Sequence, residues 1–471
     1  MSLTGALLSS RSGLSAAAAR SQTVAGNIAN AGTDGYVRRS TIVTSRQLGG
    51  GAGVEVTAIR RDADAALDRL HRLAMSRQAT QDAASATLVP YAAMLGDPGD
   101  AGTLSADLTA LQTAFDTLSV TPASSAQQLA VLDAAQGLAG QLNGLAGSLS
   151  QAAEDARGAV ARDVDRANGL LSQIAALNDR LAADTSPTAS RAALGDEMDA
   201  ALDALAPLMA FSASTGADGR VTLRTSGGAA LVEGGEAQTL AYTPATGRLT
   251  AGGVDITPSE AGSRGASEGS IAGRLTLLSD DMPRLQAQLD ETARVLIEGF
   301  AAADASLAPG QQGLFVDTGG AGSDSQGLAG RIGVNASVDP ERGGALWRIR
   351  DGAGAQTEGA ASDGTQIAAF IGVLEADHTV DPAAGLGARL GLPALAAGVM
   401  TDAQGLKARA AEAASAAAVT TAAMGSSREA AEGVSIDDQL GQLLEIEQSY
   451  AANSKVLTSV AEMIDTLLAA V

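Results

Sequence analysis

The two ends of the sequence share the same periodic spacing of apolar residues, and this feature constrains the fold more than any other. Proline is absent before Pro90 and after Pro393, so nothing at either end interrupts a helix. At both ends apolar or small residues recur at alternating steps of four and three, the heptad spacing of a coiled-coil seam. The large residues of this seam are Leu3, Leu7, Leu14, Val24, Ile28, Ile436, Leu440, Leu443, Tyr450, Leu457, Ile464 and Leu468. One such stripe alone would fit an ordinary amphipathic helix on a globular core, but two matched stripes predict that the terminal helices pair as a coiled coil.

The charges of the two ends support this pairing. Residues 1–46 contain five arginines and one aspartate, a net charge of +4, whereas residues 433–471 contain six carboxylates and one lysine, a net charge of −5. Oppositely charged segments are suited to pair within a chain or between neighbouring chains. Because alanine and serine dilute both seams, each turn buries little apolar area, so we expect the pair to need further partners for stability.

The interior of the chain predicts a mainly α fold with a β insertion. Its 471 residues favour more than one domain, and an aromatic content of 2% suits long, thin helices. Helical periodicity dominates except where Asp-Gly and Gly-Gly turn signals separate short strands. The expected parts are a terminal coiled-coil domain (1–45 and 433–471), a bundle of long helices (46–210, 270–304 and 364–432), a β-rich insertion (211–269) and a Gly-rich strand and loop insertion (305–363).

Composition argues against several kinds of chemistry. A net charge of −22 disfavours nucleic acid as a partner, and the absence of cysteine removes thiolate catalysis and Cys-ligated zinc. "GASEG" (265–269) matches the nucleophile-elbow pattern around Ser267, but it lacks the preceding apolar strand, and His71 and His378 are the only histidines. "GLGARLG" (385–391) lacks the spacing of a phosphate loop. We therefore expect no enzyme activity, no cofactor or metal site, and no membrane insertion, since every long apolar run carries charges.

A cluster of turn-forming residues ends the N-terminal helix abruptly. "GNIANAGTDGY" (26–36) concentrates asparagine and glycine, which adopt the backbone conformations that stop a helix. A plain helix cap explains this locally. Its position predicts a joint at which the chain leaves the coiled coil, formed by Asn27, Asn30, Gly35 and Tyr36.

This stretch resembles the N-terminal signature of bacterial flagellar rod, hook and hook-associated axial proteins. "GVSIDDQLGQLLEIEQSYAANSKVLTSVAEMIDTLL" (433–468) resembles their C-terminal signature: an acidic pair, a Leu-rich helix, Tyr-x-Ala-x-x-Lys-Val and Met-x-Asp-x-Leu-Leu. The long helical stretch after residue 62, together with "PRLQAQLDETARVL" (283–296) and "IGVNASVDP" (332–340), looks like the interior of the hook-associated members. The chain departs from the signature at two positions. Asp34 stands where relatives have proline, and Gly26 stands where relatives have the first residue of an Asn-Asn pair.

The resemblance implies a structural protein that joins hook to filament. It also implies export through the flagellar type III pathway, so that the protein is secreted and only transiently cytoplasmic, and assembly as a homo-oligomeric ring. The expected partners are the hook protein below, the next hook-associated protein above, and a cytosolic export chaperone on the C-terminal segment. A hook or distal rod protein of the same family remains the main alternative; a displayed enzyme or adhesin, or a cytosolic coiled-coil signalling protein, would be of another class.

Overall fold

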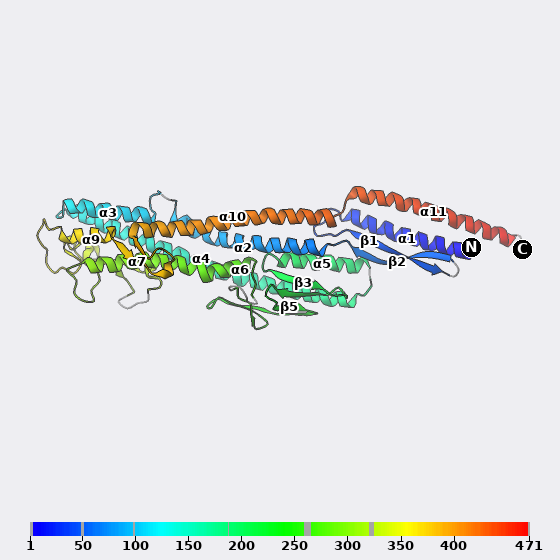
Figure 1. Cartoon of the computed structure of the whole chain (residues 1–471), viewed down its shortest axis with the longest axis horizontal. Coiled ribbons are helices and arrows are strands. Elements are labelled where there is room, and N and C mark those ends of the chain that lie inside the picture. Colours follow the sequence, from blue (N-terminus) through cyan, green and yellow to red (C-terminus); the bar gives the residue numbers. More distant parts are fainter. Residues whose placement is uncertain are drawn as a thin grey trace.

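The computed structural model describes residues 3–48, 51–97, 99–186, 188–258, 265–319 and 325–469. The molecule is a long rod with both termini at one end (Figure 1). Three apolar cores follow one another along it: a large core at the far end, a second core around the β-rich insertion, and a small core between the terminal helices. This arrangement places the two ends of the sequence together and the interior away from them.

Long helices form the body of the rod, as the periodicity predicts. They are α2 (Ala65–Leu95), α3 (Leu104–Val120), α4 (Ser125–Ala183), α5 (Ala189–Leu205), α7 (Met282–Ala303), α9 (Thr365–Glu375) and α10 (Leu392–Glu432). Side chains of Asp64, Thr103 and Ser124 accept hydrogen bonds from the first free amides of α2, α3 and α4, which fixes where these helices begin. At 1.5 Å per residue, α4 is about 88 Å long, so it extends from the first core into the second.

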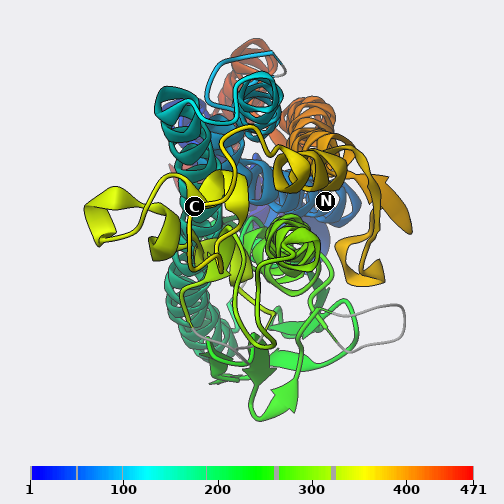
Figure 2. The ribbon, with the colours of Figure 1, turned by 90° about the vertical axis from the view of Figure 1, so that its left-hand side faces the viewer.

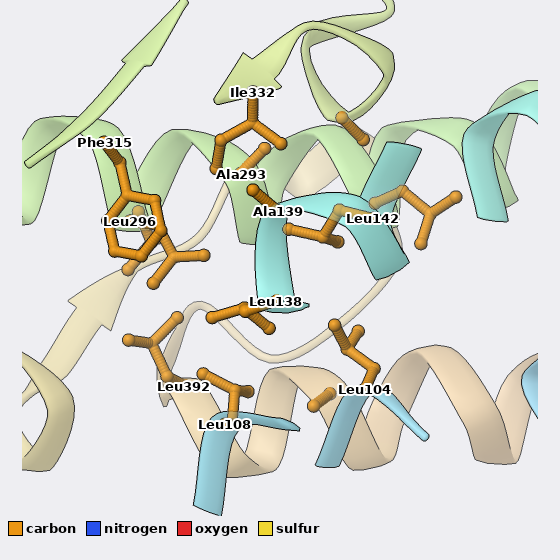
Figure 3. Close-up of a cluster of buried hydrophobic side chains, with 14 of the residues drawn as sticks. Leu104, Leu108, Leu138, Ala139, Leu142, Ala293, Leu296, Phe315, Ile332 and Leu392 are labelled. Atoms are coloured by element: carbon orange, nitrogen blue, oxygen red, sulfur yellow. The ribbon is translucent and has the colours of Figure 1, made fainter. Parts of the chain in front are cut away.

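The first core joins α3, the first half of α4, α7, α9 and the start of α10 (Figure 3). It contains four of the five phenylalanines of the chain, Phe115, Phe300, Phe315 and Phe370, with ring centroids 5.1–5.9 Å apart. Part of the Gly-rich insertion closes this core through the paired strands β10 (Phe315–Asp317) and β11 (Ile332–Val334). "ALWRIRDG" (345–352), expected to belong to a strand and loop region, contains a short helix instead, α8 (Arg348–Asp351).

The second core packs the β-rich insertion against α4 and α5. All of its strands lie inside the segment predicted to be β-rich, and they form one antiparallel sheet of four strands and another of three. Seen from the far end, these sheets lie along one side of the helices (Figure 2). The strands are β3 (Phe211–Thr215), β4 (Val221–Thr225), β5 (Ala230–Glu233), β6 (Glu236–Ala237), β7 (Leu240–Thr243), β8 (Arg248–Ala251) and β9 (Val254–Asp255).

After the β-rich insertion the chain returns to the body through α6 (Ser270–Thr276), which continues into α7 by a single π-helical turn, Leu277–Asp281. A small hairpin of β12 (Asp377–Thr379) and β13 (Arg389–Gly391) precedes α10. "GLGARLG" (385–391), which lacks the spacing of a phosphate loop, runs through the turn and second strand of this hairpin.

The expectation that residues 46–61 belong to the helical bundle is wrong. These residues complete a long antiparallel hairpin of β1 (Arg39–Leu48) and β2 (Gly51–Arg61). The hairpin packs on α1 (Leu3–Ala29), where the Ser12 hydroxyl accepts a hydrogen bond of 3.1 Å from the Val54 amide and the Thr23 and Thr41 hydroxyls lie 3.0 Å apart. The terminal helix α1 therefore lies between this hairpin and α11 (Ile436–Ala469).

Candidate functional site: the joint between the terminal helices and the body

The side chain of Asn27 connects the elements that meet where the terminal helices join the body. Its amide nitrogen donates to the Arg39 carbonyl (2.9 Å) and to Oε1 of Gln439 at the start of α11 (2.8 Å). Its oxygen accepts from the Tyr36 hydroxyl (2.9 Å) and the Arg39 amide (3.0 Å). Asn27 is buried, so a single satisfied amide group holds α1, the following turn, β1 and α11 together.

The other predicted joint residues have narrower roles. Asn30 bonds back to the Gly26 carbonyl at 2.8 Å, within its own turn. Gly35 adopts a φ of +76°, a conformation that glycine reaches without strain. The Tyr36 ring stacks on the Arg39 guanidinium, 5.0 Å from its centroid, and burial raises the pKa of this tyrosine. The structure thus brings Asn27 and Tyr36 into direct contact, while Asn30 and Gly35 shape the turn.

Beside this turn lies a chain of ion pairs that sequence reasoning missed. Arg39 and Arg61 of the hairpin both reach Asp196, at 2.8 and 2.7 Å, so that the hairpin is bound to α5. We call the connected set the joint network; it consists of Arg39, Arg61, Arg72, Arg428, Asp68, Asp196, Asp199, Asp203 and Glu432. The three aspartates of α5 follow one another at helical spacing on a single face, a pattern that identifies a charged stripe but not its partners.

The joint network extends from α5 to the elements on either side of it. Arg72 of α2 contacts Asp199 at 2.8 Å and Asp203 at 2.6 Å, and Arg428 of α10 contacts Asp203 at 2.6 Å. Although burial alone would raise it, the pKa of Asp199 is held below its usual value by the charges and hydrogen bonds of Arg61 and Arg72. The network therefore links four elements through side chains that are largely removed from water.

Glu432, the last residue of α10, continues the connection to the backbone. Its carbonyl accepts a hydrogen bond from the Arg38 amide (2.8 Å), and its carboxylate accepts one from the Asp64 amide (2.5 Å). A cleft of about 850 Å³ lies alongside, between the turn at residues 31–38 and the bend at residues 425–438. At the joint, four chain segments are therefore held together by hydrogen bonds and ion pairs, and a cleft lies on one side of them.

The terminal seam residues fall into three groups in the single chain. Val24 is buried with Ala17 and Ile446, and Ile28 and Leu443 pack against them. Leu3, Leu7, Leu14, Leu457 and Ile464 are half-buried, whereas Ile436, Leu440, Tyr450 and Leu468 are exposed. The buried row of α11 runs through Gln439, Ile446 and Val460, so part of the predicted stripe lies outside the contact between α1 and α11.

Large apolar side chains of α11 on both flanks of its contact with α1 are consequently left uncovered, and we call this exposed apolar surface the outward face of α11. Its large exposed side chains are Ile436, Leu440, Leu444, Tyr450, Val456, Met463, Leu467 and Leu468. The exposed fraction reaches 60% at Leu444 and 72% at Leu468. Eight large apolar side chains on one helix exceed the scattered exposure that is normal for a soluble surface.

The residues considered for catalysis do not assemble into a reactive centre within the described ranges. Ser267 is exposed and lies 2.9 Å from the Ser226 hydroxyl, while His378 bonds the Val373 carbonyl and His71 faces Arg428. The described residues contain no cluster of His, Asp and Glu able to hold a metal ion. Among the helices described, none combines the length and apolarity required to cross a membrane.

Comparison with known families identifies both ends and the helical region. Residues 7–36 match the flagella basal body rod protein family, and residues 429–470 match the C-terminal family of the flagellar basal body rod FlgEFG proteins. Residues 92–311 match the helical domain of the flagellar hook-associated protein FlgK. The chain is thus similar to the flagellar hook-associated proteins in its helical region and to flagellar rod proteins at both ends. In this family context, the joint lies between the rod-type terminal segments and the FlgK-type helical region.

Curated relatives agree with this family. Flagellar hook-associated protein 1 of Salmonella typhimurium is 28% identical over 302 residues, which cover 61% of this chain and 54% of the relative. The chain thus spans about half the length of this hook-associated protein, whereas the Bacillus subtilis hook-associated protein 1 is matched over 97% of its length and 98% of this chain, at 24% identity. A solved structure of the flagellar hook junction protein FlgK from Burkholderia pseudomallei has a TM-score of 0.44 at 23% identity and covers 53% of this chain and 46% of its own.

Proposed function

We propose that this protein is a structural component of the bacterial flagellum that self-assembles into the junction between hook and filament. The observation that carries the proposal is the outward apolar face of α11, which lies on the terminal segment matched by the rod-protein family. A helix with exposed apolar side chains on both flanks of its contact with α1 can pack against α1 and against neighbouring subunits at the same time. The FlgK-type helical domain favours the junction over the hook or distal rod.

In this proposal the terminal helices form a coiled-coil layer between subunits of a ring. The basic character of α1 and the acidic character of α11 support pairing between copies, because opposite charges help to set partner and register. The hook protein would adjoin the ring on one side and the next hook-associated protein on the other. The body and the β-rich insertion, which extend away from the termini, would then lie outside the terminal layer.

The same apolar face supports the proposed route of export. Before assembly its side chains would be exposed to water, so a cytosolic chaperone that covers α11 would keep the subunit from premature association. The protein would then pass through the flagellar type III pathway and remain in the extracellular flagellum. Binding of the chaperone to residues 433–471 alone would support this step.

Deletion of the gene followed by electron microscopy tests the junction role. We expect cells with complete hooks, no attached filament, and filament protein released into the medium. A strain lacking hooks would instead identify a hook or rod protein, and a strain with normal filaments would contradict the proposal. Complementation with the wild-type gene is the control.

A further inference from the structure

The joint network contains one more acid than its arginines can neutralise. It has four guanidinium groups and five carboxylates, and the carboxylate of Asp68 is the least well compensated. This residue is 5% exposed, lies one helical turn before Arg72 on α2, and faces α5 and α10. A buried charge without full compensation is costly.

The neighbouring arginines are committed to other partners. Arg72 donates to Asp203 and Asp199, and its nearest nitrogen is 4.0 Å from Asp68. Arg428 donates to Asp203 and Glu432; its Nε lies 3.0 Å from Oδ1 of Asp68, but that oxygen accepts no aligned hydrogen bond from the described residues. Asp68 therefore receives attraction from two cations without the hydrogen bonds that stabilise a buried carboxylate.

We propose that the joint takes up one proton, on Asp68, in mildly acidic solution and is held more tightly in the protonated state. With Asp68 neutral, four positive and four negative groups remain in the network. The joint between the terminal helices and the body would then be stiffer in mild acid than at neutral pH, the reverse of the usual acid sensitivity of ion pairs.

The electrostatic surroundings agree with this assignment. Burial, followed by the Asp199 carboxylate, raises the pKa of Asp68 to about 6; Glu432 adds to the rise, while Arg72 and Arg428 oppose it. Because the pKa of Asp68 is higher in the folded state than in the unfolded state, protonation of Asp68 stabilises the closed joint. This stabilisation is complete below about pH 4 and is lost as pH rises through about 6. Of the neighbouring carboxylates, Asp203 pairs with Arg428. The pKa of Asp199 is lowered, so Asp199 becomes protonated and stops stabilising the joint only in stronger acid.

Protonation of His71 affects the joint in the opposite direction to protonation of Asp68, so the test uses a variant that lacks this histidine. Burial and the charge of Arg428 lower the pKa of His71, so protonation favours the opened joint as pH falls below about 6.5. A His71→Gln variant of the full chain removes this opposing effect. The reporters are the amides of Arg38 and Asp64, which bond to Glu432 across the joint.

The experiment is hydrogen exchange of the monomer at pH 4.5 and 6.5, corrected for intrinsic exchange. In His71→Gln we expect the opening equilibrium that exposes the Arg38 and Asp64 amides to exchange to increase on the order of tenfold from pH 4.5 to pH 6.5. Adding Asp68→Asn should abolish that pH dependence and raise protection at pH 6.5. The matched variant Asp199→Asn should reduce protection at both pH values, because it removes a carboxylate that two arginines bind.

Two results would overturn the proposal. Equal opening at both pH values in His71→Gln would show that no proton is taken up at the joint in this range. Retention of the pH dependence after Asp68→Asn would assign the proton to another group. If Asp68→Asn does not fold, Asp68→Glu replaces it, and an unchanged pH midpoint in that variant counts against Asp68.

Discussion

At the scale of single residues, Asn27 shows how one side chain determines the joint. Both of its amide protons and its oxygen are used, with partners on the hairpin, the turn and α11. The sequence predicts that residues 26–36 form a joint that includes Asn27 and Tyr36, and in the structure the Tyr36 hydroxyl donates a hydrogen bond to Asn27. The contact with Gln439 lies 412 residues away along the chain, and no local pattern can specify so distant a pair.

Substitution of Asn27 by alanine should loosen the joint. The change leaves the Arg39 amide, the Tyr36 hydroxyl and the Gln439 side chain without their partner, and each buried polar group left unpaired costs about 1–3 kcal/mol. Hydrogen exchange of residues 24–39 should therefore accelerate strongly. Asn30→Ala is the control, since Asn30 bonds only within its own turn and should change exchange little; equal effects in the two variants would contradict the role given to Asn27.

At the scale of elements, helices were predictable and the contacts between them were not. The repeat of Leu108, Leu111, Phe115 and Leu118 predicts α3, and all four side chains are buried. The hairpin of β1 and β2 was missed although "STIVT" and "VEVT" flank a run of three glycines, because the helical periodicity of the long segment that follows dominates this part of the chain. The joint network was missed for another reason: its ion pairs join α2, α5, α10 and the hairpin, and only the folded chain determines which charges meet.

The crossing of α6 over α2 gives a test at this scale. Gly273 of α6 lies so close to α2 that a Cβ atom there would be 2.5 Å from the Thr80 carbonyl oxygen. Gly273→Ala should force the two helices apart and destabilise the body by about 1–3 kcal/mol. Gly137→Ala in α4, where nothing lies within 4 Å, should instead stabilise it by about 0.5–1 kcal/mol.

Thermal unfolding followed by circular dichroism measures both glycine variants. The expected result is a lower midpoint for Gly273→Ala and a slightly higher one for Gly137→Ala. A midpoint for Gly273→Ala equal to that of the wild type would mean that α6 can move away from α2 without loss of packing.

At the scale of the whole molecule, the three cores differ in how much apolar surface they bury within the single chain. The first two contain many buried Leu, Val, Ile and Phe side chains, whereas the core between α1 and α11 is a cluster of three buried residues, Ala17, Val24 and Ile446. Buried apolar area supplies most of the stability of a domain, so the terminal helices depend on contacts beyond α1 and α11 more than the body does. The outward face of α11 is where such contacts are available.

A charge on this outward face should separate folding from assembly. Leu444 is 60% exposed, so Leu444→Asp should leave the stability of the monomer almost unchanged while it places a carboxylate in the proposed contact between subunits. Leu443→Asp is less informative, because Leu443 packs against the terminal core and its loss would disturb the single chain as well. The matched control is Val120→Asp at the end of α3, where the side chain is 81% exposed on the body.

We expect Leu444→Asp cells to export the protein but to lack attached filaments, and Val120→Asp cells to swim normally. Immunoblots of the medium and electron microscopy of the hooks distinguish failed export from failed incorporation. Normal filaments with Leu444→Asp would show that the outward face of α11 is not a contact between subunits, because a buried, unpaired carboxylate in each copy would be repeated around the whole ring.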